Sequence, residues 1–435
     1  MQASAAAMLD GSPVDFGASE TGGGGGGSSA MVYLHRIEGC LVNSECFREL
    51  APKGLASRRF SFFQPAKNQY RLGVTSTEIS TGGNSYPVLI DSGVLATAGD
   101  RIREKLAPAR CATISDTNVG PRFAVPIQKS LRAAGFEPTL ITVQAGEQSK
   151  MLEQAGAICE QMLEAGLDRQ SFVIGLGGGV IGDLSGFVAA IFERGIPHVQ
   201  IPTTLLAMVD SSIGGKTGVN TRAGKNLIGA FHHPMLVIDD VDVLKTLPER
   251  ELSQGFAEII KHGIIADANL FRNLNEMSGD KLDCLKQSSF PELIRQNVEI
   301  KARIIAKDES DRKGERASLN FGHTIGHGIE RASNYHGISH GEAVSLGIVA
   351  ACEISMKKSG LPSSDRNAIV DLLSKFNLPT KLPASFPRQR IFEALKFDKK
   401  FEHGQIRFVV TPKIGSAYLS TDVTVEDIRE AVKIL

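Results

Sequence analysis

Three histidines and one glutamate in the second half of the chain have the residue types of a divalent-metal site. His323 and His327 are four residues apart, which would place both on one helix face, and His340 follows them. Glu258 would share a helix face with Lys261, three residues on. Two imidazoles and a carboxylate can bind Zn²⁺ and leave a position open for a substrate oxygen. Spacing alone favours His323 and His327 as the metal pair, although such a pair also occurs on ordinary helix surfaces.

A glycine-rich segment lies between a candidate strand and a candidate helix. Gly177, Gly179 and Gly182 satisfy the G-x-G-x-x-G pattern of dinucleotide-binding turns. Such glycines let the backbone approach a pyrophosphate, and the helix N-terminus supplies N–H groups; a turn for tight packing is the alternative. The acid expected about 20 residues later is absent. Asp116, at the end of an earlier candidate strand, is placed to bind the ribose instead, which favours NAD over NADP.

Two lysines and several glycines are concentrated in one short segment. Gly215, Lys216 and Thr217 resemble the end of a P-loop, but Asp210 stands where the first glycine of that motif should be. A nucleoside triphosphatase is therefore not expected. Lys225 adds a second cation to the same region. Because lysines bind phosphate as point charges, the segment predicts a small phosphorylated substrate, with an ordinary solvated loop as the alternative.

Composition excludes several classes of function. The chain has 435 residues, 42% hydrophobic and 22% charged, which is typical of a globular protein of two domains. Basic and acidic residues are equal at 48 each, so no partner of the nucleic-acid class is expected. No apolar run approaches the roughly 20 residues of a membrane helix, so no membrane partner is expected either. The six cysteines form no C-x-x-C pair, which favours reduced thiols.

The elements that position these residues predict an α/β fold. Residues 71–79 and 86–90 flank a hairpin turn, and helical segments separate further short strands at 112–115, 140–143, 171–176 and 198–201. This alternation indicates a parallel sheet with helices on both faces, over about residues 71–250. From residue 251 to 435, apolar spacing predicts mainly helices, at 251–265, 290–306, 322–333 and 342–359, with one strand or loop at 405–410.

Residues 1–70 differ from the rest of the chain. They contain a run of six glycines at 22–27, and the first basic residue is Arg36. Residues 50–77 then hold five basic residues and no acidic one. Basic, serine-containing sequence ahead of a globular domain predicts an organelle transit peptide. Three acidic residues among the first twenty are unusual for such a signal, and a disordered tail is the alternative.

From residue 72 onward the sequence resembles the 3-dehydroquinate synthase family. The matching stretches occur in order along the chain, which makes them more specific than any single motif. They are GEQSK at 146–150, GGGVIGD at 177–183, PTTL at 202–205, DSSIGGK at 210–216, GKN at 224–226, TLP at 246–248, AEIIK at 257–261, LNFGHTIGH at 319–327, HGE at 340–342 and DKK at 398–400.

The resemblance implies a Rossmann-like NAD-binding domain, a mostly helical metal-binding domain and a homodimer. It assigns Zn²⁺, or Co²⁺, to Glu258, His323 and His340, so that His327 would contact substrate instead of metal. The other residues implied to contact substrate are Asp210, Lys216, Lys225, Asn226, Lys261, Lys301, Arg316, Asn320 and Lys399 or its neighbour Lys400, with Arg194 reaching the phosphate in the neighbouring subunit. Those implied to hold NAD are Asp116, Asn118, Glu147, Lys150, Gly178, Gly179, Val180, Asp183, Thr203, Thr204, Leu206, Thr246, Leu247 and Glu251.

The family's reaction suits these residues. It implies a phosphorus–oxygen lyase of the shikimate pathway that converts 3-deoxy-D-arabino-heptulosonate 7-phosphate to 3-dehydroquinate and phosphate. Transient oxidation by NAD of an alcohol acidified by the metal is followed by phosphate elimination, return of the hydride, ring opening and aldol closure. NAD is therefore regenerated in each cycle. A monofunctional enzyme of this family behind a transit-like leader implies a plant plastid.

Three other functions are considered. A related sugar-phosphate cyclase would use the same cofactors, but it has no reason to keep Arg316, Asn320 and Lys399 together as a grip for a carboxylate. A metal-dependent polyol dehydrogenase would release NADH and would not need the two lysines and Arg194 for phosphate. A binding protein without activity would need neither a complete metal set nor a dinucleotide turn.

Overall fold

The computed structural model describes residues 75–81, 83–308, 314–333, 337–395 and 406–435. The predicted transit peptide at 1–70 lies outside the described residues, as do Lys399 and Lys400. Residues 69–435 form one contact unit, so the division at residue 250 stays a prediction. Within the described part of the chain, no helix has both the length and the apolar character of a membrane span.

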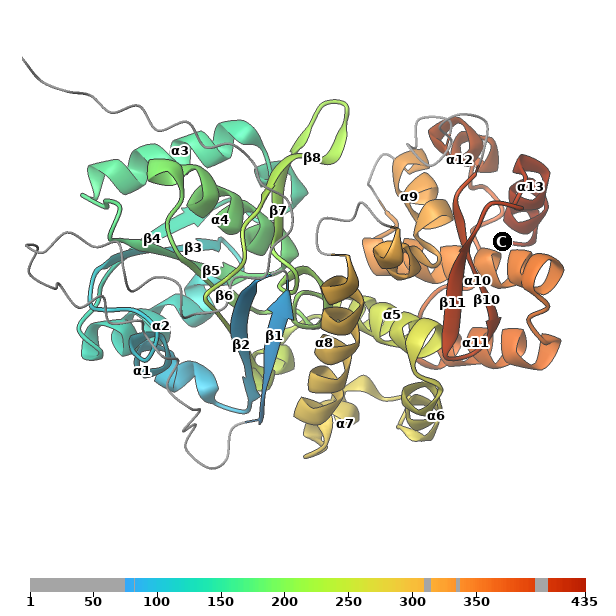
Figure 1. The fold of residues 1–435 in the computed structure, drawn as a ribbon, viewed down its shortest axis with the longest axis horizontal. Helices are drawn as coiled ribbons and strands as arrows, with labels where there is room; N and C mark the ends of the chain where they lie inside the picture. Colours follow the sequence, from blue (N-terminus) through green and yellow to red (C-terminus); the bar gives the residue numbers. More distant parts are fainter. Residues whose placement is uncertain (1–74, 82, 309–313, 334–336, 396–405) are drawn as a thin grey trace, which may run out of the picture. The chain divides into compact units, whose positions relative to one another are not determined.

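A seven-stranded sheet organises the first half of the chain (Figure 1). Its strand order is β1-β2-β9-β6-β5-β3-β4, and neighbouring strands are parallel except for β1 with β2. The strands are β1 Thr75–Thr81, β2 Asn84–Asp91, β3 Arg110–Asp116, β4 Glu137–Val143, β5 Phe172–Gly177, β6 His198–Pro202 and β9 Leu236–Asp240. Every residue of β5, β6 and β9 is buried, as expected for central parallel strands covered on both faces. The predicted α/β class and its parallel sheet are confirmed.

Helices cover both faces of this sheet. Figure 1 shows α1 (Ala98–Arg103) and α2 (Gly120–Ala133) on one side and α3 (Leu152–Glu164) and α4 (Gly179–Ile191) on the other. A separate hairpin of β7 (Lys216–Thr221) and β8 (Gly224–Phe231) packs against α4. The sequence analysis expected a loop there. The segment forms a hairpin in which the two glycine-containing strands pair antiparallel through their backbones.

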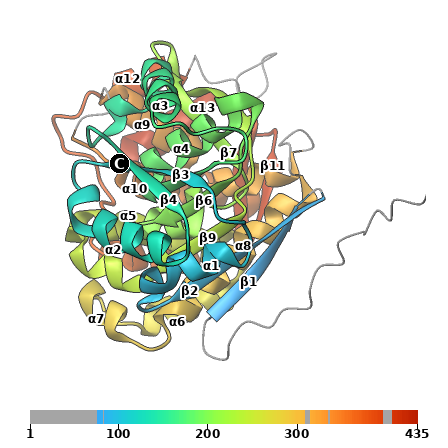
Figure 2. The same ribbon diagram turned by 90° about the vertical axis from the view of Figure 1, so that its left-hand side faces the viewer.

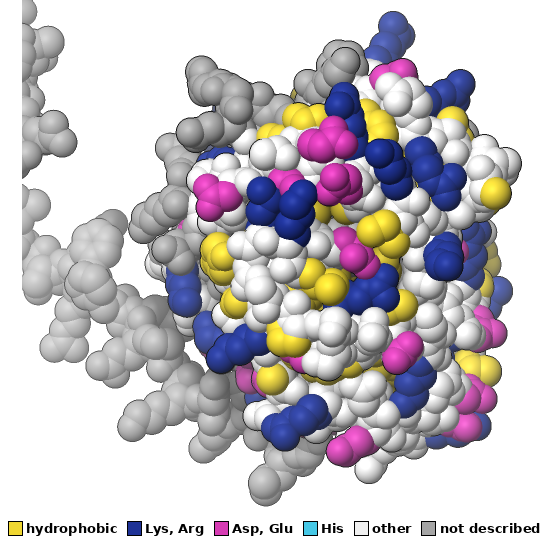
Figure 3. Space-filling view, turned by 90° about the vertical axis from the view of Figure 1, so that its right-hand side faces the viewer, with side chains coloured by type: hydrophobic (Ala, Val, Ile, Leu, Met, Phe, Trp, Pro, Cys, Tyr) yellow, Lys and Arg dark blue, Asp and Glu magenta, His cyan; other side chains and the backbone are white. Residues whose placement is uncertain are grey.

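The second half is mainly helical, as predicted. Its helices are α5 Glu249–Ala266, α6 Ala268–Glu276, α7 Lys281–Lys286, α8 Phe290–Lys307, α9 His323–Ala332, α10 His340–Ser359, α11 Ser363–Lys375, α12 Arg388–Leu395 and α13 Val425–Ile434. One hairpin, β10 Phe408–Lys413 with β11 Ser416–Ser420, packs on α10. Helix α8 lies beside β1 at the sheet edge in both ribbon views (Figures 1 and 2). On the face shown in Figure 3, basic and acidic side chains are interspersed.

Helices α9 and α10 approach each other at glycines. A Cβ added to Gly347 would lie 1.9 Å from the carbonyl oxygen of Gly322, and one added to Gly326 would lie 3.0 Å from that of Ala343. Gly322 itself has a φ of 77°, a left-handed conformation that favours glycine. Because α9 begins at His323 and α10 at His340, this close approach sets how near the two histidines lie.

We expect Gly347→Ala to lower the free energy of unfolding by about 1 to 3 kcal/mol, because backbone atoms that cannot rotate away block the added methyl group. Gly156→Ala on α3 is the matched control, since a Cβ there meets nothing within 4 Å. It should raise stability by about 0.5 to 1 kcal/mol through helix propensity. Urea unfolding of both variants measures the difference, and equal stabilities would contradict the close packing of α9 on α10.

Candidate active site

Helix α5 carries a buried ion pair, which is the most deeply buried part of the site. The Glu258 side chain has 0% exposure and that of Lys261 has 1%, and the Lys261 ammonium group contacts Glu258 Oε2. The two residues lie one turn apart, so the helix itself aligns them. A carboxylate this deeply buried requires positive charge or strong donors around it.

Two histidines at helix N-termini face Glu258 from α9 and α10. His323 Nε2 lies 3.4 Å from Glu258 Oε1, and His340 Nε2 lies 3.9 Å from the same oxygen. Helix α10 is fixed at its start by a capping box between Ser339 and Glu342. One ligand atom from each of Glu258, His323 and His340 lies within 4.8 Å of the other two.

The Nδ1 atom of each histidine, which points away from Glu258, has its own hydrogen-bond partner. His323 Nδ1 lies 3.2 Å from the carbonyl oxygen of Phe321, and His340 Nδ1 lies 3.3 Å from Glu330 Oε2. Such contacts fix the tautomer and leave Nε2 as the ligand atom. Two oriented imidazoles and a carboxylate therefore fit a tetrahedral ion such as Zn²⁺, with one position open.

Electrostatics favour the Glu258 anion and the neutral form of His323, whereas contact with the Glu330 carboxylate outweighs burial and raises the pKa of His340. Burial disfavours the Glu258 anion, but the charge of Lys261, followed by the contacts with His323 and His340, outweighs it and holds the pKa of Glu258 well below its usual value. Burial, reinforced by the charge of Lys261, lowers the pKa of His323, so its imidazole is neutral. The Glu330 carboxyl also has a lowered pKa, because contact with His340 and the charge of Lys225 outweigh its burial.

His327 occupies a different position from the one that spacing alone favours. Its ring centroid lies 5.5 Å from that of His323, and its side chain is exposed. Among the described residues, the ligand groups that the geometry brings together pair His323 with Glu258 and His340, and His327 with Glu330 and His340. His323 and His327 share no such group, because His327 lies one turn further along α9, where it is exposed, whereas His323 is buried. Metal binding by any of these residues stays a prediction.

A second ion pair, between the buried Lys301 and the half-buried Asp210, joins the sheet half to α8. Lys301 Nζ lies 2.6 Å from Asp210 Oδ1 and also contacts the Asp210 carbonyl oxygen. Asp210 belongs to η4, a one-turn π-helix at Ala207–Ser211. Burial would raise the pKa of Asp210, but the charge of Lys301 prevails and lowers it to about 2. Burial lowers the pKa of Lys301 despite this partner.

Arg316 lies next to this pair at a glycine turn. It is buried, with 6% exposure, and a Cβ on Gly214 would lie 3.3 Å from its guanidinium. Gly214 and Gly215 have φ values of 100° and 66°, so the turn after η4 needs glycine for its backbone conformation as well as for space.

The β7–β8 hairpin is held against the sheet half by Lys150. Its Nζ lies 2.5 Å from Asp183 Oδ2 on α4 and 2.6 Å from Asn226 Oδ1 on the hairpin. Burial raises the pKa of Asp183 although the charge of Lys150 opposes this. Asn226 adopts a φ of 56°, the left-handed conformation that Asn tolerates best among residues with side chains.

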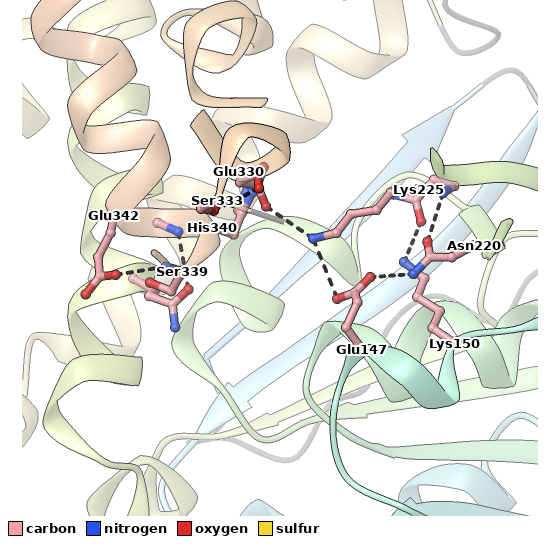
Figure 4. Close-up of polar contacts among 12 residues, drawn as sticks. Glu147, Lys150, Asn220, Lys225, Glu330, Ser333, Ser339, His340 and Glu342 are labelled. Carbon is pink, nitrogen blue, oxygen red and sulfur yellow. Dashed lines mark hydrogen bonds and ion pairs between the residues drawn. The ribbon is translucent and has the colours of Figure 1, made fainter. Parts of the chain in front are cut away.

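Lys225 connects the hairpin to α9 (Figure 4). Its Nζ lies 3.2 Å from Glu330 Oε1 and 3.9 Å from Glu147 Oε2. Asn220 completes the network by donating from Nδ2 to Glu147 Oε1 at 2.7 Å. Glu330 and Asn220 were missed by the sequence analysis. Only Glu330 had a signal there, because it lies three residues after His327 and shares its helix face.

The predicted dinucleotide turn has the expected context. Strand β5 leads to Gly178, the N-cap of α4. A Cβ on Gly178 would lie 3.1 Å from Thr204 Cγ2, and one on Gly179 would lie 3.0 Å from Ser211 Oγ, so both glycines allow close packing. The start of α4 offers backbone N–H groups to an anion such as a pyrophosphate.

The remaining cofactor candidates follow the carboxyl ends of parallel strands. Because these ends meet at one edge of the sheet, they form the usual ligand-binding edge of an α/β fold. Asp116 ends β3 and accepts hydrogen bonds from the backbone of Asn118 and Val119. The others are Glu147 after β4, Val180 in the first turn of α4, Thr203, Thr204 and Leu206 after β6, Thr246 and Leu247 after β9, and Glu251 in the first turn of α5.

Three further residues predicted to contact substrate lie at the ends of short elements. Lys216 is exposed at the start of β7, and Asn320 is half-buried at the end of η6 (Glu315–Asn320). Arg194 is exposed at the end of η3 (Phe192–Arg194), beyond the C-terminus of α4. Since Gly178 lies at the other end of this helix of 13 residues, about 20 Å separates the two along its axis. The structure therefore does not bring Arg194 to the dinucleotide turn of its own chain.

Comparison with known proteins decides the family. Models described as "3-dehydroquinate synthase N-terminal" and "3-dehydroquinate synthase C-terminal" match residues 140–254 and 255–401. The 3-dehydroquinate synthase of Desulforamulus reducens is 42% identical over 351 residues, which cover 81% of this chain and 97% of that protein. The chain belongs to the 3-dehydroquinate synthase family. A further member, from Nostoc sp., is 42% identical over 350 residues, or 80% of this chain and 96% of its own.

Solved structures agree with this family. The 2-epi-5-epi-valiolone synthase ValA of Streptomyces hygroscopicus subsp. jinggangensis, solved with NAD⁺ and Zn²⁺ bound, is 27% identical with a TM-score of 0.74, covering 82% of this chain and 98% of its own. A 2-deoxy-scyllo-inosose synthase at 24% identity has a TM-score of 0.75 and covers 83% and 99% of the two chains. The second likeness supports the fold alone.

We expect Lys150→Met to lower the free energy of unfolding by about 2 to 3 kcal/mol, because it leaves the Asp183 carboxylate largely buried without its cation. Without that ammonium group the pKa of Asp183 should rise further. An acid whose pKa is raised by folding destabilises the protein when ionised, so the deficit should be smaller at about pH 5 than at about pH 8. Denaturant unfolding at both pH values tests this, with the exposed Lys129→Met on α2 as the control. If the loss in free energy of unfolding were the same at both pH values, the Asp183 carboxylate could not be its cause.

Proposed function

We propose that the chain is a 3-dehydroquinate synthase, a phosphorus–oxygen lyase that converts 3-deoxy-D-arabino-heptulosonate 7-phosphate to 3-dehydroquinate and phosphate. The observation that carries the proposal is the buried Glu258 carboxylate facing Nε2 of His323 and His340. Membership of the family supports the choice of reaction.

The cofactors are a regenerated NAD and a divalent metal, Zn²⁺ or Co²⁺. ValA, which is similar over most of its length, binds NAD⁺ and Zn²⁺. In this chain Glu258, His323 and His340 would hold the metal, and the turn at Gly178 and Gly179 would receive the NAD pyrophosphate. When bound, NAD supplies a reversible hydride acceptor and the metal a Lewis acid for a substrate alcohol.

The chain's own residues bind and orient an anionic substrate. Lys261 and Lys301 place buried ammonium groups beside Glu258 and the half-buried Asp210, in a largely buried region. Charges in such a region interact more strongly than in water, so they can stabilise a phosphate that gains charge as it leaves. The buried Arg316 offers a planar guanidinium for bidentate contact with the substrate carboxylate. The roles of Lys216, Lys225, Asn226, Asn320, His327 and Lys399 as further substrate contacts are part of the proposal.

A homodimer is also part of the proposal. Strand β8 pairs only with β7 among the described strands, so one of its edges is open. It carries three exposed apolar side chains, with Leu227 at 53%, Ile228 at 37% and Phe231 at 53% exposure. An open edge with an apolar surface suits pairing with a second copy. Arg194, remote from the dinucleotide turn of its own chain, would then serve the neighbouring site.

A plastid location stays a prediction. It is supported by the composition of residues 50–77, which predicts a transit peptide, and by the resemblance to a monofunctional enzyme of this family, whereas the relatives named above are bacterial. Fluorescent tagging of the full chain in plant cells distinguishes plastid import from retention in the cytosol.

We expect the full chain with Zn²⁺ to release many phosphates per NAD from the heptulosonate phosphate, because the hydride returns in each cycle. Phosphate and 3-dehydroquinate are followed with NAD well below the substrate concentration. Glu258→Ala should retain no metal and lose at least about a thousandfold in rate. The control is Glu353→Gln, which removes the charge of an ion-paired glutamate on α10. Accumulating NADH would instead indicate a polyol dehydrogenase, and absent phosphate release would indicate another sugar phosphate.

If Arg194 acts on the neighbouring subunit, two inactive variants should complement each other. Refolding an equal mixture of Arg194→Ala and Glu258→Ala makes half of the dimers heterodimers, and each has one site with both groups intact. The mixture should therefore recover about a quarter of the wild-type activity. No recovery, with heterodimers demonstrated by differential tagging, would show that Arg194 acts within its own chain.

A further inference from the structure

Glu330 is a buried carboxylate with a contact on each oxygen. It lies on α9, and its side chain has 5% exposure. Oε2 lies 3.3 Å from His340 Nδ1, and Oε1 lies 3.2 Å from Lys225 Nζ. The carboxylate therefore joins a candidate metal ligand to a lysine of the β7–β8 hairpin (Figure 4).

The contact with His340 decides which ring nitrogen faces the metal site. An imidazole can bind a metal through either nitrogen, and a partner on one selects the other. With Glu330 at Nδ1, the His340 Nε2 lies 3.9 Å from Glu258 Oε1. A carboxylate in this outer position also makes the imidazole a stronger electron donor.

Glu330 could alternatively be a metal ligand, since it forms a second candidate group with His327 and His340. Two observations argue against that role. Lys225 already supplies a cation to Glu330, whereas His323 and His340 both turn Nε2 toward Glu258. The group around Glu258 is also more deeply buried, because His327 is exposed.

Lys225 brings the other side of the site into this network. It lies on β8, 105 residues before Glu330, and its side chain has 28% exposure. Its Nζ also lies 3.9 Å from Glu147 Oε2, on the edge of the sheet proposed to hold NAD. A change in the position of the hairpin would therefore act on the orientation of Glu330.

We propose that Glu330 is a positioning residue for the metal site, which holds His340 with Nε2 toward Glu258 and is itself held by Lys225 from the hairpin. The proposal rests on the metal site of the proposed function. It adds a link from the dinucleotide side of the site to the geometry of the metal ligands, made through Glu330, which acts on the metal only through His340.

Binding of Co²⁺ to the metal-free full chain tests the role of Glu330 without an activity assay. Affinity is measured by competition with a chelator, and geometry by the visible absorption of the bound ion. We expect Glu330→Ala to weaken Co²⁺ about 10- to 100-fold and to shift the absorption bands. Glu330→Gln keeps an acceptor for His340 and should recover part of the affinity. Glu353→Gln, an ion-paired glutamate on the helix of His340, should match the wild type.

The outcomes separate this proposal from the function on which it rests. If the wild type binds no Co²⁺, or if Glu258→Ala binds it normally, the metal site itself is wrong. If Glu258→Ala abolishes binding while Glu330→Ala has wild-type affinity and spectrum, only the positioning role is overturned. If Glu330→Ala abolishes binding as completely as Glu258→Ala, Glu330 is a ligand and the positioning role is again overturned.

A double-mutant cycle tests the link through Lys225. Lys225→Met should change Co²⁺ affinity about two- to fivefold when Glu330 is present, the range expected for one partly exposed ion pair. The same substitution should have no effect in Glu330→Ala, because its route to His340 is gone. Lys286→Met, which removes an exposed ion pair on α7, is the control. An equal effect of Lys225→Met in both backgrounds, or none in either, would overturn the link.

Discussion

The charge of Glu258 is the constraint on which the site depends. A carboxylate with no exposure is costly unless cations and donors surround it, and this one is met by Lys261 and two imidazoles. These groups come from three helices, so α5, α9 and α10 must converge on one point. The glycine contact between α9 and α10 makes that convergence possible, because any side chain at Gly347 would separate them.

The same principle recurs around the site. Asp210 is paired with Lys301 and Asp183 with Lys150, and in each pair the partners come from different elements. Each pair therefore fixes the position of one element relative to another: η4 to α8, and α4 to the hairpin through Asn226. A site built in this way presents several ammonium groups to an anionic substrate. Phosphate and carboxylate binding thus uses the charges that hold the elements together.

Local patterns predicted the central strands of the sheet and the helices that carry the site. The strand, glycine turn and helix around Gly177 to Gly182 follow from short-range signals, and α5, α8, α9 and α10 follow from apolar spacing. The β7–β8 hairpin was missed because glycine, lysine and asparagine do not alternate with apolar residues as in a half-buried strand. β9 was missed because a run of five residues has too little periodicity to distinguish it from a loop.

The sequence alone determined the fold class, the family and the residue types of the metal and phosphate chemistry, because these depend on motifs within a few residues of one another. Only the tertiary structure decided which of these residues meet. It separated His327 from the group of Glu258, His323 and His340, against the spacing and in line with the family resemblance, and placed Arg194 a helix length from the dinucleotide turn. It also brought Glu330 to both His340 and Lys225. Residues a hundred positions apart, such as Lys225 and Glu330, meet because helices pack against the sheet half. A local sequence pattern carries no information about such a long-range contact.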